Sequence, residues 1–195
     1  RFFMLSDSPP NRDMEWSDSG IEGSWRFLNK LWNFVNDLVK KKVDKKLPIS
    51  LSKSQKNLLT TLNNTIEEVT KSIDDFHFNI AVASIRSLFN VLTSYKILND
   101  NDRSVVSHAT KNLLILINPM VPHIAEELWE KFVENKNMIS VERWPVINTS
   151  YEKSNKIKIP VQVNGKMRAI IEVQTNLSKD ELENIALNEK NVLKF

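Results

Sequence analysis

The chain has 195 residues, of which 41% are hydrophobic and 26% charged, a balance typical of globular proteins that fold in water. This length allows one ordinary domain and a smaller second one. The longest apolar runs, such as Leu113 to Ile117, are much too short to span a membrane. The absence of cysteine excludes disulfides, thiol nucleophiles and thiolate metal sites, and it fits a reducing, cytoplasmic compartment.

Basic residues are concentrated in two stretches, although the formal net charge of +3 is too small to predict nucleic-acid binding by itself. Between Leu38 and Leu58, seven lysines stand against a single acid: Lys40, Lys41, Lys42, Lys45, Lys46, Lys53 and Lys56. Between Lys153 and Ile171 there are five basic residues and no acid: Lys153, Lys156, Lys158, Lys166 and Arg168. Solvated surface charge is the plainer interpretation of both stretches, and contact with phosphates is the alternative.

A long first helix is predicted by apolar side chains that recur every 3.6 residues. Ser19 and Glu22 have the spacing of a capping box at its start. The helix runs into the lysine-rich stretch and stops before Pro48. Its apolar stripe consists of Ile21, Trp25, Leu28, Trp32, Val35 and Val39. We therefore expect Trp25 and Trp32 to pack in the core, as we do for Trp129 in a later helix.

Four further helical patterns follow. The first carries apolar residues from Leu59 to Phe76, and the next begins after Asn79, a plausible N-cap. Another follows the turn-rich residues 99–102 and ends or kinks at Pro119, and a short one covers Val121 to Phe132. Four or five helices with short connections predict an antiparallel bundle.

Beyond Trp144 and Pro145 the apolar period changes to two, which predicts two strands joined by the turn dipeptide Asn164-Gly165. A simple two-residue loop would pair Val163 with Lys166 and mix charge into the apolar face. We therefore predict one additional residue at Lys166, by a three-residue loop or a bulge. The resulting pairs are Val163 with Met167, Val161 with Ala169, and Ile159 with Ile171.

Ser178 and Glu181 form a second capping-box pattern ahead of a helix through about Leu187, whose apolar residues we expect to cover the hairpin. The predicted fold class is thus mainly α: an antiparallel four- or five-helix bundle followed by a small, incomplete α+β unit. Such a short sheet is expected to keep an open edge.

The sequence contains no catalytic constellation. The three glycines, Gly20, Gly23 and Gly165, form no phosphate-cradling loop. The three histidines, His77, His108 and His123, have no partners at metal-ligand spacing, so they are interpreted as surface or core residues. Neither a cofactor nor a metal site is predicted in this chain.

Three motifs resemble those of a known family. Residues 8–20 (SPPNRDMEWSDSG) resemble the junction between the catalytic core and the helical domain of bacterial leucyl-tRNA synthetases. Residues 118–129 (NPMVPHIAEELW) are similar to a helix break found in the leucine, isoleucine, valine and methionine enzymes, in its leucine form. Residues 161–168 (VQVNGKMR) are similar to the first strand pair of the leucine enzyme's C-terminal domain.

This resemblance implies a division of the chain. Residues 1–19 would be the junction from a catalytic core that is absent here, and residues 20–145 a helical, anticodon-binding-type domain that binds tRNA. Residues 146–154 would be a linker and residues 155–195 the start of the C-terminal domain. Because the chain begins at Arg1 without methionine or a signal-peptide pattern, we interpret it as a fragment.

The resemblance also implies a function. The full-length enzyme would be a cytoplasmic, monomeric leucine–tRNA ligase that uses ATP with Mg²⁺ in its catalytic core, and this fragment alone would be inactive. Its partners would be tRNA(Leu) and that core, with no membrane. Bacterial leucyl enzymes recognise tRNA largely by its shape and elbow, so we expect contacts to the RNA backbone rather than to bases. Few aromatic residues lie beside the basic stretches to stack on bases.

Candidate tRNA-binding residues follow from the basic stretches: Arg26, Lys30, Lys40, Lys41, Lys166 and Arg168. Trp16 precedes the first helix, and in the resembling junction it would pack toward the catalytic core. Two alternatives stay open at this point. One is a helical scaffold for protein interactions, since a bundle does not determine function. The other is the same region of an isoleucyl, valyl or methionyl enzyme, against which the hairpin after the bundle argues.

Overall fold

The computed structural model describes residues 1–41, 47–133, 137–151, 156–163, 166–174, 177–189 and 192. Within the strands, the side chains of Lys156, Ile157, Lys158, Lys166, Glu172 and Gln174 lie outside this description, as do Lys42, Lys45, Lys46, Lys153, Asn164 and Gly165 altogether. The chain divides into two compact units, Arg1–Tyr151 and Glu152–Phe195. Each unit is described by itself.

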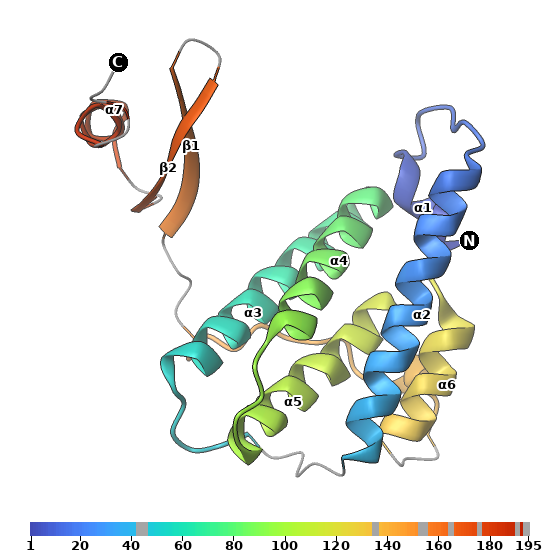
Figure 1. Cartoon of the computed structure of the whole chain (residues 1–195). Helices are drawn as coiled ribbons and strands as arrows, with labels where there is room; N and C mark the ends of the chain where they lie inside the picture. Colours follow the sequence, from blue (N-terminus) through green and yellow to red (C-terminus); the bar gives the residue numbers. More distant parts are fainter. Residues whose placement is uncertain are drawn as a thin grey trace. The chain divides into compact units, whose positions relative to one another are not determined.

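The first unit is a bundle of α-helices, as predicted (Figure 1). Its helices are α1 (Phe2–Asp7), α2 (Asp18–Lys40), α3 (Lys53–Asp74), α4 (Phe78–Ser94), α5 (Asp100–Ile117) and α6 (Pro122–Val133), followed by the 3-10 turn η1 (Ile139–Val141). Helix α5 contacts α3, α4 and α6, whereas α2 packs on α6 and α1 packs on α2 and α4. None of the described helices is both long and apolar enough to cross a membrane.

The helix starts differ in part from those that the sequence patterns predict. Helix α2 is capped by Ser17, which accepts from the Gly20 amide, and not by a capping box at Ser19. Helix α3 begins earlier than predicted, with a complete capping box between Ser52 and Gln55. The proposed N-cap Asn79 lies inside α4, which has His77 at its N-cap position without a side-chain cap. A cap depends on local dihedral angles, which spacing alone does not determine.

The buried face of α2 is displaced from the predicted stripe. Its buried residues are Ser24, Phe27, Leu31, Val35 and Leu38. The core prediction is correct for Trp129, which has no exposed surface, and Trp32 packs partly buried against the core. It is wrong for Trp25, which is 66% exposed. Apolar residues lie on more than one side of α2, so only its neighbours determine which side is buried.

A buried carboxylate joins three segments of the bundle. Asp102 is 4% exposed and accepts from Gln55 of α3 at 2.7 Å, from the Tyr95 hydroxyl at 3.1 Å and from the Leu98 amide at 3.0 Å. Burial acts to raise the pKa of Asp102, but the hydrogen bonds from these groups and from the Asn99 backbone outweigh it. The pKa therefore lies below the ordinary carboxyl value, and the side chain is ionised at neutral pH.

The α3–α4 turn contains a left-handed residue that is not glycine. Phe76 has φ of 59° and is 65% exposed. Its amide donates to the Ile73 carbonyl and that of His77 to the Ser72 carbonyl at 2.7 Å, which is the hydrogen-bonding pattern of a Schellman motif. Phe76 was predicted to continue the apolar stripe, and instead it leaves the helix, with its ring edge-on to Phe78.

The second unit consists of the antiparallel strands β1 (Lys156–Val163) and β2 (Lys166–Gln174) and helix α7 (Lys179–Leu187). The capping box at Ser178 and Glu181 is present as predicted. Helix α7 contacts β2, but it contains no buried residue, and Ile185 is 40% exposed. In the described residues the sheet has no third strand.

The hairpin register is partly as predicted. Val161 pairs with Ala169 and Ile159 with Ile171, which confirms that the outgoing strand carries one additional residue. The residue is not where we placed it: Val163 pairs with Lys166 and Gln162 with Met167, so the irregularity falls at Arg168. Val163 pairs directly with Lys166 next to the turn, and the bulge restores the apolar pairing further along the strands, where Ile171 and Val173 are buried.

The Asp102 site predicts a pH-dependent stability. Replacing Asp102 by alanine leaves buried donors without an acceptor and should lower the free energy of unfolding by roughly 1–3 kcal/mol. Because the pKa of Asp102 is lower in the folded state, its contribution is complete above the unfolded value of about 3.9 and is lost as the pH falls further. Urea denaturation between pH 3 and 7 measures this. Asp100→Ala, an exposed acid in the same helical turn, is the control, and an equal loss in both variants would contradict the assignment.

The Phe76 turn predicts a stabilising substitution. Phe76→Gly should raise the free energy of unfolding by about 1 kcal/mol, because glycine adopts a positive φ without a steric penalty. Phe76→Ala keeps the penalty and removes the ring contact with Phe78, so it should not stabilise the bundle. Thermal denaturation of both variants tests the argument, which fails if glycine lowers the melting temperature.

Candidate nucleic-acid interface

The four predicted basic residues of the first helix lie along α2 and its C-terminal end. Arg26, Lys30, Lys40 and Lys41 are all exposed. At a rise of 1.5 Å per residue, Arg26 and Lys40 are about 21 Å apart along the helix axis. Lys40 contacts Asp37 at 3.4 Å, but both side chains are largely exposed, so the pair holds the lysine only weakly. The helix thus presents a row of cations to solvent.

The same basic stretch continues into α3. Lys53 and Lys56 lie in the first two turns of α3 and are exposed. Cations near a helix N-terminus face the positive end of the helix dipole, which is unfavourable for stability. Their position therefore contributes to a positive surface potential without stabilising the helix. Lys42, Lys45 and Lys46 lie outside the described residues.

The two basic residues predicted in the hairpin are placed by the backbone of β2. Lys166 begins the strand, and its side chain lies outside the description. Arg168 is the bulged residue, opposite neither Val161 nor Gln162. Its side chain is half-buried. Arg168 is thus less exposed than the four basic residues of α2 and its C-terminal end.

Trp16 lies beside an N-terminal segment that is attached firmly to the bundle. Phe2 of α1 is buried and stacks on Phe27 with ring centroids 5.0 Å apart, and the Arg86 guanidinium lies 5.2 Å and 5.3 Å from these two rings. Burial lowers the pKa of Arg86 from its ordinary value, although an arginine remains charged at neutral pH. Phe3 contacts Trp16 edge-on at 6.0 Å.

Trp16 itself is 71% exposed, and its indole donates to Asp18. Two further large apolar side chains of α1 and α2, Met4 and Trp25, are also mostly exposed. Exposed aromatic residues of this size are uncommon on a free surface. The N-terminal part of the unit therefore offers apolar side chains for a contact with protein or nucleic acid.

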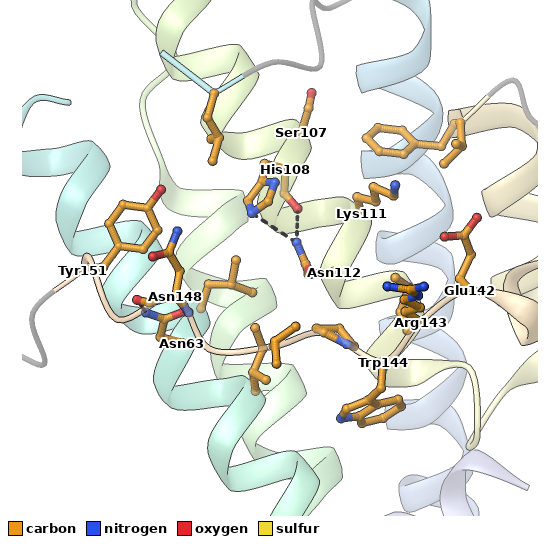
Figure 2. A pocket seen from close by; sticks show the side chains of 18 residues that line it. Asn63, Ser107, His108, Lys111, Asn112, Glu142, Arg143, Trp144, Asn148 and Tyr151 are labelled. Carbon is orange, nitrogen blue, oxygen red and sulfur yellow. Dashed lines mark hydrogen bonds between the residues drawn. The ribbon is translucent and has the colours of Figure 1, made fainter. Parts of the chain in front are cut away.

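A cavity of about 460 Å³ lies in the helical unit, between α3, α5, the end of α6 and the segment 142–151 (Figure 2). Asn63 of α3 holds that segment by donating to the Asn148 carbonyl at 2.8 Å and accepting from the Asn148 amide at 3.1 Å. His108 and Asn112, one turn apart on α5, form part of the wall. Burial, and secondarily the charge of Lys111, lowers the pKa of His108, so this imidazole is neutral at pH 7.

Sequence reasoning did not find this cavity. The pair His108 and Asn112 has the i, i+4 spacing of neighbours on a helix, which is a visible signal. The residues opposite them come from segment 142–151, which the sequence assigned to the end of the bundle and a linker. Among the described residues, no group of three or more acidic or histidine side chains could hold a metal ion.

Comparisons of the sequence and of the structure with known proteins agree on one protein family. A model of the anticodon-binding domain of tRNA ligases matches residues 55–183. A leucine–tRNA ligase of Petrotoga mobilis is 38% identical over the whole chain and one of Rickettsia bellii 39%, and the chain spans 24% and 22% of their lengths. The chain therefore corresponds to about a quarter of these relatives.

Among solved structures, the chain resembles the agnB2 LeuRS of Agrobacterium radiobacter K84, which was crystallised in a ternary complex with tRNA and LeuAMS. The TM-score is 0.72 at 26% identity, and the match covers all of this chain and 25% of that one. The similarity extends through both compact units. The chain belongs to the family of anticodon-binding domains of tRNA ligases, and leucine–tRNA ligases are among its relatives.

Proposed function

We propose that this chain is the tRNA-binding portion of a leucyl-tRNA synthetase. It positions tRNA(Leu) through backbone and shape contacts, while the remainder of the enzyme joins leucine to the tRNA at the expense of ATP. The observation that carries the proposal is the similarity of the entire chain to leucine–tRNA ligases, one of them crystallised with tRNA. The exposed cations of α2 and α3 supply the complementary charge.

The chemistry of the basic residues favours phosphates over bases as their ligands. Lysine and arginine side chains on an open helix surface contact phosphate oxygens without reading sequence. Arg26, Lys30, Lys40 and Lys41 are arranged along an axis rather than around a pocket, which suits an extended backbone. Trp25 lies next to Arg26 and is exposed, so one aromatic ring is available beside these cations.

The catalytic chemistry belongs to the part of the enzyme outside this chain. The residues described here do not fit an ATP site: Gly20 lies inside α2, where an added Cβ would meet the Phe3 ring at 2.5 Å, and Gly23 is also helical. ATP and Mg²⁺ would therefore be bound by the catalytic core. We place the enzyme in the cytoplasm as a monomer, in keeping with this function.

The exposed apolar residues near the N-terminus provide the second proposed contact. Met4 lies in α1 and Trp16 contacts Phe3 of that helix edge-on, and Phe2 and Arg86 hold α1 against the bundle. We propose that Trp16 packs against the catalytic core. A firmly attached α1 would keep the orientation of the bundle relative to that core, because the contact would not depend on a flexible connection.

The α2 cations can be tested in the full-length protein. Replacing Arg26, Lys30, Lys40 and Lys41 by glutamine should weaken tRNA(Leu) binding and reduce the slope of log K against log salt by about 0.7–0.9 per lost contact. Filter binding at several salt concentrations measures both. Glutamine at Lys71 and Lys96, which are exposed lysines elsewhere on the bundle, is the control. Unchanged affinity in the quadruple variant would assign these residues to a solvated surface.

The hairpin is tested independently of α2. The double substitution Lys166→Glu, Arg168→Glu should weaken tRNA(Leu) binding in the full-length enzyme, with leucine and ATP binding unchanged, because it places two anions where phosphates would lie. Lys179→Glu in α7, an exposed lysine of the same unit, serves as the control. Equal affinity of the double variant and the wild type would remove the hairpin from the interface.

A further inference from the structure

The cavity beside α5 has the size and the wall of a small-ligand site. Its volume of about 460 Å³ lies within the usual range of roughly 300–1,000 Å³. Apolar surface comes from Leu62 and Ile66 of α3 and from Ile115 of α5, and the half-buried Trp144 adds an aromatic ring. The Trp144 indole donates to Thr70 at 2.8 Å, which fixes the orientation of this ring. The cavity therefore offers a preformed apolar surface.

A ligand can reach this cavity from solvent along segment 142–151. Arg143 and Val146 both line the cavity, and both are exposed. The segment is held in place by the two hydrogen bonds between the Asn63 side chain and the Asn148 backbone. The opening beside Arg143 and Val146 is thus part of the folded unit, and entry requires no helix to unfold.

The charged side chains in the wall sum to one positive charge. Lys111 and Arg143 are cationic and Glu142 is anionic. Burial lowers the pKa of His108, so this imidazole is neutral at pH 7, as is the Tyr151 phenol. A wall with this balance of charge favours a ligand that carries a single negative charge.

Lys111 is a half-buried cation without an ionic partner. Its amine lies 5.3 Å from the centre of the Trp129 ring, and none of the described carboxylates forms an ion pair with it. A ring contact leaves the three ammonium hydrogens free to donate. The charge of Lys111 acts within the cavity, since it contributes to the lowered pKa of His108. Ile115 follows one helical turn later, so the cation adjoins the apolar wall on the same side of α5.

The principal amide groups of the wall are already partnered. The Asn112 Nδ2 atom donates to the His108 carbonyl at 2.8 Å and lies 3.4 Å from the His108 Nε2 atom (Figure 2). The Asn63 side chain is engaged by the Asn148 backbone. The selection of a ligand therefore depends on charge and apolar shape rather than on a matched set of hydrogen bonds.

We propose that this cavity binds a small organic acid, with one carboxylate on an aromatic or branched apolar body. The carboxylate accepts hydrogen bonds from the Lys111 amine, and the apolar body lies against Ile115 and Trp144. A phosphate monoester fits less well, because it carries nearly two negative charges at neutral pH and the wall supplies a net charge of one. The inference goes beyond the proposed function and does not rest on it.

The first experiment compares acids with their amides by isothermal titration of the full-length protein. The probes are hydrocinnamate and isocaproate, each against the amide of the same acid, so only the charge of the head group changes. At least one acid should bind at one site at least about tenfold more tightly than its amide, because a charged acceptor strengthens the bond to Lys111. The comparison uses the wild-type protein, so it does not depend on the folding of a variant. Equal binding of each acid and its amide, or no saturable binding of either acid, overturns the proposal.

The second experiment replaces Lys111 by methionine, which removes the amine and keeps an apolar stem of similar length. The preference for the acid over the amide should be lost. Lys131→Met is the matched control, because the Lys131 amine also lies over a ring, 4.3 Å from the centre of Trp32, and Lys131 is not part of the cavity wall. An unchanged preference in Lys111→Met, or an equal loss in both variants, overturns the assignment to Lys111.

A third measurement locates the bound acid. A ligand in this cavity contacts α5 and segment 142–151 together, so saturating acid should slow amide hydrogen exchange in that segment of the wild-type protein. Unchanged exchange in residues 142–151 at saturation would place the acid elsewhere and overturn the proposal. None of these measurements involves tRNA, so their outcome is independent of the proposed function.

Discussion

Helix α5 is buried on almost all sides, and this constraint organises the helical unit. It contacts α3, α4 and α6, and twelve of its eighteen residues are buried. The polar side chains on the buried sides of such a helix are removed from water, which favours partners inside the protein. Asp102 does so by accepting hydrogen bonds from α3 and from the segment before α5. His108 and Asn112 do so by contacting each other at the edge of a cavity.

The burial of α5 also distinguishes its role from that of α2. A helix that is enclosed by its neighbours can hold a precise arrangement of polar groups, because packing restricts their rotamers. Helix α2 lies at the periphery, where one face packs on α6 and the other carries Arg26, Lys30 and Lys40 in solvent. Long, mobile cations suit phosphates, whose positions along a backbone vary.

The second unit is built on less buried surface. Ile171 and Val173 are buried, whereas α7 has no buried residue, and Met167 and Ile170 are mostly exposed. A sheet of two strands with one helix is close to the lower limit of independent stability. The second unit therefore has less buried surface of its own to stabilise it than the bundle has. Its proposed role in tRNA binding depends more on contacts outside the unit.

The sequence by itself determined the type and order of most elements and the family. Local signals carry this information: the 3.6-residue and two-residue periods, the Ser178 cap, and the short motifs at residues 8–20, 118–129 and 161–168. The total register shift in the hairpin also followed from the alternation of apolar side chains, since burial requires one apolar face.

Only the tertiary structure decided which sides of the helices are buried and which residues meet. Trp25 belongs to a correct helical period, yet it is exposed because α6 and α1 pack on a neighbouring face of α2. The bulge lies at Arg168 and not at Lys166, because either position restores the apolar pairing of Val161 with Ala169 and the alternation of apolar residues cannot distinguish them. The cavity joins α5 to segment 142–151, and contacts at such a separation depend on the packing of whole helices, which no local pattern encodes.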